Sequence, residues 1–317
     1  MDSNIVLFLR NLFYSPSKIP DAELKGWLEF VKFLKTKKVI GSMAVQELSW
    51  DFAKLSVDAI KYRRLNSALE SLLSEPLQLE RIQNKIDHED TLVSKSSSKR
   101  SLDNIHLNSE QNIHVVPTMC VLLKFYELSK LYDVEKDYKI IFKNLCSFMA
   151  SGINMVGAYE LSLLQRILFS QNIDKVKEIR RLLKLDSKSD FKKNLWNASY
   201  DITFMRSLNA LPVQAMRGEP INSIYNPVLV TKDIDLASMT REILENTEIA
   251  ETNGKLYPHL RFELEKEEDK IFIFSCIESL KLLSQQRYSI NKKKSLSQRM
   301  EELRETIKQT EERINTL

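Results

Sequence analysis

Two aspartates in the second half of the sequence stand in apolar surroundings where a carboxylate could do chemistry. Asp201 lies on a stretch with helical spacing, and Phe204 and Met205 are among the residues that share its helix face. Asp233 follows the apolar, β-branched run 227–231 after one residue, Lys232. Because an isolated carboxylate in apolar surroundings is costly unless it is paired or binds a cation, both aspartates are candidates for a metal-binding site.

Three further acids have similar surroundings nearer the N-terminus. Glu47 shares a predicted helix face with apolar residues, and Glu160 shares one with Leu163 and Leu164. Asp2 precedes an apolar stretch at the start of the sequence. For any one of these acids taken alone, an ion pair with Lys or Arg on a helix surface is the simpler explanation, so the argument depends on their combination.

The elements that position these acids are mostly helices. Apolar spacing and capping residues predict helices at about 21–36, 42–64, 115–130, 136–150, 156–170, 173–184 and 190–208. The run 227–231, bounded by Pro227 and by Lys232, is the best candidate for a buried strand. The Ser- and Lys-rich segment 90–104 and the Pro- and Asn-rich segment 209–226 are predicted to be loops.

The C-terminal segment 293–317 has apolar residues at alternating spacings of four and three. The seam consists of Leu296, Met300, Leu303, Ile307, Thr310, Ile314 and Leu317. Such a seam is typical of a coiled coil, which could join two copies of the chain or a partner protein. An amphipathic helix packed on its own domain has the same pattern, and the sequence leaves both interpretations open.

Composition limits the class of protein. Of the 317 residues, 43% are apolar and 28% are charged, as in ordinary globular proteins, and no apolar run is long enough to span a membrane. The net charge of +4 permits nucleic-acid binding without arguing for it. No secretory signal is evident, and three widely separated cysteines indicate free thiols, so we expect a cytoplasmic protein.

Four segments, taken together, resemble motifs of PIN-domain nucleases. Residues 2–6 (DSNIV) look like the opening motif of that family, and residues 41–48 are similar to the helix that carries its glutamate. Residues 197–205 look like the helix of its third acid, and residues 227–233 are similar to its strand followed by a T-x-D motif. The segments occur in the family's order and cover less than half of the chain.

The resemblance implies a cluster of carboxylates that holds one or two Mg²⁺ or Mn²⁺ ions. Its members would be Asp2, Glu47, Asp201 and Asp233, with Asn4 and Thr231 as supporting polar groups. Asp201 and Asp233 would lie side by side at one edge of a small buried sheet. Hard divalent cations prefer such oxygen ligands, so the residue types suit the implied metals.

Two acids compete with members of this cluster. Glu160, which follows a Gly-Ala pair, is closer in sequence to Asp201 than Glu47 is and could replace that glutamate. Asp235 could add to Asp233 or replace it.

The resemblance also implies an α/β fold, with a small parallel sheet flanked by helices. The nuclease core would consist of residues 1–64 and 191–265, interrupted by a helical insertion at 65–190 and followed by C-terminal helices at 266–317. One departure from the family is that Asp2 follows Met1 directly, where a strand is expected to precede the first aspartate.

The implied function is a metal-dependent endonuclease that hydrolyses phosphodiester bonds, with RNA favoured over DNA as substrate. With this activity, the protein could serve as a toxin or a defence effector. The alternative is a non-catalytic helical interaction protein built on a PIN-like core, which the helical insertion and the heptad tail favour.

Overall fold

The structure, a computed structural model, covers most of the chain. It describes residues 1–39, 41–52, 56–88, 115–153, 157–187, 190–216, 227–252, 255–260, 264, 266–291 and 293–317. The predicted loop at 90–104 lies outside the described residues.

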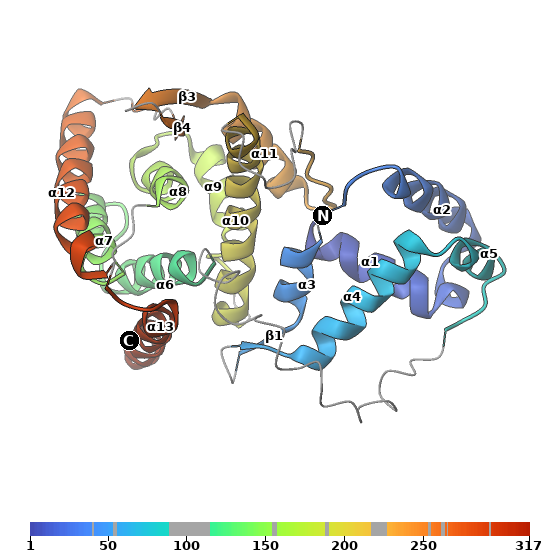
Figure 1. Cartoon of the computed structure of the whole chain (residues 1–317). Helices are drawn as coiled ribbons and strands as arrows, with labels where there is room; N and C mark the ends of the chain where they lie inside the picture. Colours follow the sequence, from blue (N-terminus) through green and yellow to red (C-terminus); the bar gives the residue numbers. More distant parts are fainter. Residues whose placement is uncertain are drawn as a thin grey trace. The chain divides into compact units, whose positions relative to one another are not determined.

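The chain divides into two compact units, coloured along the sequence in Figure 1. Unit 1 consists of Met1–Asn108 and Leu229–Ile234, and unit 2 consists of Ser109–Val228 and Asp235–Leu317. These boundaries differ from the division expected from the sequence. Of the residues 191–265 that were expected to complete the N-terminal core, only the segment 229–234 groups with the N-terminal residues.

Unit 1 is a small helical assembly around α1. Its elements are α1 (Ser3–Tyr14), η1 (Pro16–Lys18), α2 (Asp21–Lys35), α3 (Ser42–Leu48), α4 (Ala59–Ser74) and α5 (Leu77–Gln83), with β1 (Trp50–Asp51) and β2 (Ser56–Val57). Ile5, Leu9 and Leu12 follow one face of α1 at helical spacing and are all buried. They meet α4, whose Leu65 and Leu72 are buried as well, so the α1–α4 contact forms the core that fixes the first residues of the chain.

Unit 2 is built around α6, which is buried on nearly all sides. Its elements are α6 (Val115–Leu131), α7 (Tyr138–Ser151), α8 (Ala158–Phe169), α9 (Ile173–Leu182), α10 (Phe191–Met216), α11 (Ile234–Glu245), β3 (Thr247–Thr252), β4 (Lys255–Leu260), α12 (Glu267–Asn291) and α13 (Leu296–Thr316). Helices α7, α8, α10 and α13 contact α6, which explains its almost continuous apolar sequence. No described helix is sufficiently long and apolar to cross a membrane.

The predicted α/β fold is wrong. Within the described residues, strands form two separate two-stranded antiparallel sheets, β1–β2 in unit 1 and β3–β4 in unit 2, and helices make up most of the rest. The predicted strand at 227–231 is not a strand, and Val228 is 78% exposed. A strand needs a neighbour for its ladder of hydrogen bonds. The apolar residues after Asp2 cannot serve, because they form α1.

The helices predicted within 115–184 are confirmed, and two other predictions need correction. The helix expected at 42–64 ends at Leu48 and gives way to the β1–β2 hairpin before α4 begins at Ala59. Helix α10 continues to Met216, so the first part of the predicted loop 209–226 is helical. Residues 217–226 of that predicted loop lie outside the described part of the chain.

The heptad seam of α13 packs on α6 of the same unit. Met300, Leu303, Ile307 and Thr310 are buried there. At the same interface, the Arg313 guanidinium donates a 2.6 Å hydrogen bond to the Glu127 carboxylate. Burial would raise the pKa of Glu127, but hydrogen bonds from Arg313 and Lys124 lower that pKa below its usual value. Packing within the chain therefore accounts for the four buried seam residues, and partner binding through 293–317 stays a prediction.

Replacing Ile307 by Ala tests this packing. Ile307 is 3% exposed, so the change is expected to lower the free energy of unfolding by about 2–5 kcal/mol. The control Lys308→Ala, at an exposed neighbouring position, should stay within about 0.5 kcal/mol of wild type. Urea unfolding at several protein concentrations provides the measurement. A midpoint that rises with protein concentration would contradict packing within one chain.

Candidate functional site

Asp2 is a buried carboxylate held by three hydrogen-bond donors in unit 1. It is 2% exposed and caps the N-terminus of α1 with an extended backbone. Its Oδ1 accepts from the Ser3 hydroxyl at 3.2 Å. Its Oδ2 accepts from the Asn4 side-chain amide at 3.2 Å and from the Thr231 hydroxyl at 2.8 Å. These donors fix the orientation of the carboxylate.

The segment 229–234 is docked on the start of the chain by the main chain as well as by side chains. The Asp2 amide donates to the Val230 carbonyl oxygen at 3.0 Å. The Thr231 hydroxyl accepts from the Asp233 amide at 2.9 Å while it donates to Asp2. One hydroxyl therefore links the Asp2 carboxylate to the main chain of Asp233. Of the predicted site residues, the structure thus brings together Asp2, Asn4, Thr231 and Asp233.

The positive end of a helix and the amino group of the chain are both neighbours of Asp2. The positive end of the α1 dipole lies at this residue, since the Ile5 and Val6 amides both donate to the Asp2 carbonyl oxygen. The amino group of Met1 is another neighbour: burial lowers its pKa and the charge of Asp2 raises it. A carboxylate offers about four acceptor positions, and the three side-chain donors take up three of them at Asp2.

Glu47 belongs to the same unit but lies on a different element. It is half-buried on α3, between the buried Gln46 and the half-buried Leu48. Helix α3 contacts both α1 and α4, so the glutamate is held by the same core that holds Asp2.

Asp201 belongs to unit 2, whereas Asp233 belongs to unit 1. It is 5% exposed on α10, and its Oδ2 is 4.0 Å from the Lys184 ammonium nitrogen. The expectation that Asp201 and Asp233 flank one edge of a small sheet is wrong, because the described part of the chain contains no such sheet. The prediction of a carboxylate among apolar residues is met at Asp201, and a lysine provides its counter-charge.

Glu160, the predicted rival of Glu47, forms a buried ion pair in unit 2. It is completely buried on α8 and accepts a 2.5 Å hydrogen bond from the Thr118 hydroxyl of α6. The Arg206 guanidinium of α10 pairs with the same carboxylate oxygen. This group joins α6, α8 and α10, so the burial of the glutamate is explained by an internal ion pair between three helices.

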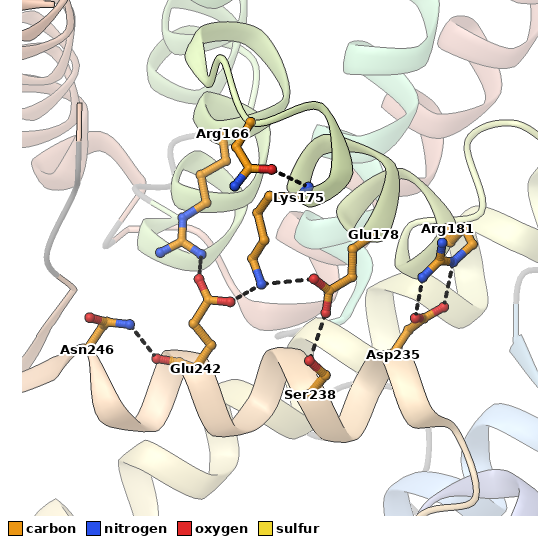
Figure 2. A network of polar contacts seen from close by, with 9 residues as sticks. Arg166, Lys175, Glu178, Arg181, Asp235, Ser238, Glu242 and Asn246 are labelled. Atoms are coloured by element: carbon orange, nitrogen blue, oxygen red, sulfur yellow. Dashed lines mark hydrogen bonds and ion pairs between the residues drawn. The ribbon is translucent and has the colours of Figure 1, made fainter. Parts of the chain in front are cut away.

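Asp235 takes part in a charged network that attaches α11 to α8 and α9. The Arg181 guanidinium donates to both oxygens of Asp235, at 2.8 and 3.1 Å. Figure 2 shows this pair beside the other contacts of α11. The hydrogen bond from Arg181 lowers the pKa of Asp235, which stays ionised near neutral pH. Further along α11, Glu242 pairs with Arg166 and with Lys175. Asp235 is therefore neutralised by an arginine.

The residues around Asp2 supply only part of the oxygen ligands that a hard divalent cation binds. Within the described ranges, no three His, Cys, Asp or Glu side chains form a group that could hold a metal ion. Mg²⁺, however, commonly keeps several waters and is bound through one or two carboxylates. The Thr231 hydroxyl links the Asp2 carboxylate to the main-chain amide of Asp233, and both acids belong to unit 1.

Comparison of the chain with protein-family models, with curated proteins and with solved structures finds no match.

The sequence analysis missed two features of this region. Ser3, directly after Asp2, is one of the three donors to the carboxylate. Lys232, between the two site residues of the docked segment, places its ammonium over the rings of Phe8 and Trp27. The aromatic residues at intervals of three in 27–33 were a signal for this second feature.

Replacing Arg206 by Met tests whether Glu160 is structural. The change leaves a buried carboxylate without its counter-charge, so the free energy of unfolding should fall by about 3–5 kcal/mol. Adding Glu160→Leu should recover part of that loss. The control Arg180→Met removes the more exposed ion pair with Asp186 and should cost at most about 1 kcal/mol. Urea unfolding measures all three. An Arg206→Met variant as stable as wild type would contradict the structural role.

Proposed function

We propose that the chain is a metal-dependent phosphodiesterase that cleaves RNA, with its principal carboxylates in unit 1. One observation carries the proposal. The Thr231 hydroxyl joins the buried Asp2 carboxylate to the main chain of Asp233, across most of the sequence length. A carboxylate oriented by neutral side-chain donors is suited to bind a cation, whereas one paired with arginine is already neutralised.

Each residue of the site has a definite role in this proposal. Asp2 and Asp233 bind Mg²⁺ or Mn²⁺, while Asn4 and Thr231 hold the Asp2 carboxylate in a fixed orientation. A bound divalent ion supplies an activated water and stabilises negative charge on phosphate oxygens. Glu47, which belongs to the same unit, remains a further carboxylate of the proposed site. The role predicted for Asp201 from the sequence stays a prediction, because Asp201 belongs to unit 2. The buried free cysteines Cys120, Cys146 and Cys276 support a reducing compartment such as the cytoplasm.

A second candidate function is that of a non-catalytic helical interaction protein. A specific observation favours it: α12 has an exposed apolar face opposite its buried one. Ile271, Phe274 and Leu282 on this face are 66%, 70% and 59% exposed. Exposed apolar residues grouped on one face are typical of surfaces that bind other proteins.

Cleavage of RNA by variants of the two unit 1 aspartates tests the nuclease proposal. Purified protein should cleave a labelled RNA in Mg²⁺ or Mn²⁺ and not in EDTA. Asp2→Asn and Asp233→Asn should lower the rate to background, because each removes a proposed metal ligand. The control Asp174→Asn, at an exposed position on α9, should cleave like wild type. Equal cleavage by wild type and both site variants would overturn the assignment.

Thermal unfolding separates the two candidate functions. If Asp2 binds a metal ion in the folded protein, Mn²⁺ raises the melting temperature by mass action. Asp2→Asn should abolish that rise, and Asp174→Asn should retain it. The interaction protein predicts the same melting temperature for wild type with and without Mn²⁺.

A further inference from the structure

Unit 1 has an aromatic surface next to the docked segment 229–234. The rings of Phe8 on α1 and Trp27 on α2 are stacked, with their centroids 3.5 Å apart and their planes 20° from parallel. The Lys232 ammonium lies 4.5 Å from the Trp27 centroid and 4.7 Å from the Phe8 centroid. Since Lys232 is exposed and stands between Thr231 and Asp233, this surface begins one residue from the proposed site.

The surface continues along α2. Phe30 packs edge-to-face on Trp27, with centroids 5.6 Å apart. Phe33 is 53% exposed and has the Lys37 ammonium 5.3 Å from its centroid. By helix geometry Trp27 and Phe33 are about 9 Å apart along the axis and about 120° apart around it, so the aromatic residues wind around α2. We call this surface the aromatic strip; it consists of Phe8, Trp27, Phe30 and Phe33 with the lysines Lys37 and Lys232.

The aromatic strip lies outside the fully buried positions of α2. Helix α2 contributes Leu24, Val31 and Leu34 to the core, and all three are buried. Trp27 is only half-buried. The other two tryptophans of the chain, Trp50 and Trp196, are 7% and 2% exposed.

We propose that the aromatic strip binds unpaired bases of a nucleic-acid strand, which stack on Trp27 and the phenylalanines while Lys232 and Lys37 contact phosphates. The two lysines favour nucleic acid over an apolar peptide, because they place positive charge where a polyanion passes the rings. Stacking of bases on aromatic side chains with basic groups nearby is a general mode of single-strand binding.

This inference rests on the proposed function, because it supplies the substrate contact beside the same site. A strand bound on the aromatic strip passes Lys232, and its backbone then lies close to Thr231 and Asp233. Bases inside a duplex are already stacked on one another, so the strip selects unpaired segments. Stacking contacts the bases and does not distinguish ribose from deoxyribose, so RNA and DNA strands of one sequence both bind.

Binding without metal tests the aromatic strip independently of cleavage. The full-length protein in EDTA is titrated with a short oligouridylate, and tryptophan fluorescence is recorded. Trp27 is the least buried tryptophan, so stacking should quench its emission. Trp27→Leu should weaken binding roughly tenfold or more. Lys232→Gln should lower the slope of log affinity against log salt by about 0.7, the value for one lost phosphate contact on a single strand.

Matched controls lie on α12 of unit 2. Phe274→Leu removes an exposed aromatic ring and Lys281→Gln removes a lysine paired with Glu278. Both controls should bind the oligonucleotide like wild type. Circular dichroism of each variant checks the fold, and Lys232→Gln changes only an exposed side chain.

The possible outcomes distinguish a failure of the aromatic strip from a failure of the proposed nuclease function. Unaltered binding by Trp27→Leu and Lys232→Gln overturns the aromatic strip, as does no binding of the single strand or equally tight binding of a duplex. Metal-dependent cleavage together with any of these results leaves the nuclease proposal standing. Trp27-dependent binding without cleavage supports the strip and overturns the nuclease.

Discussion

The hydrogen bond from the Thr231 hydroxyl to the Asp2 carboxylate is the contact on which the candidate site of unit 1 depends. It joins residues 229 positions apart, and the bond from the Asp2 amide to Val230 reinforces it. Together these bonds return the segment 229–234 to the start of the chain. The orientation of Asp2, the position of Asp233 and the placement of Lys232 over Trp27 all follow from this docking.

The buried carboxylates of the chain are stabilised in two ways. In unit 2, Glu160 pairs with Arg206 and Asp235 with Arg181, so cations of the protein already offset these carboxylates. In unit 1, the side chains that donate to Asp2 are the hydroxyls of Ser3 and Thr231 and the amide of Asn4, and the positive group beside it is the Met1 amino group, whose pKa burial lowers. Neutral donors stabilise a carboxylate without cancelling its charge, and that difference separates a candidate cation ligand from a structural ion pair.

Local patterns were predictable from the sequence, and long-range pairings were not. The helices between 115 and 184 follow from apolar spacing within each segment. The run 227–231 has the composition of a strand, but a strand also needs a partner, and the residues that might have paired with it form α1. The grouping of Asp2 with Thr231 was anticipated only through the resemblance of short motifs. The pairing of Glu160 with Arg206, 46 residues apart, left no signal in the sequence.

The central claim is that the Thr231 hydroxyl prepares Asp2 to bind a divalent cation. Electron paramagnetic resonance of free Mn²⁺ during titration measures that binding directly, with Thr231→Val and Thr231→Ser as a matched pair. Loss of a group that orients a metal ligand should weaken affinity about 10- to 100-fold in Thr231→Val, and Thr231→Ser should retain the wild-type affinity. Equal Mn²⁺ affinity in wild type and Thr231→Val, or no Mn²⁺ binding by wild type, would contradict the account.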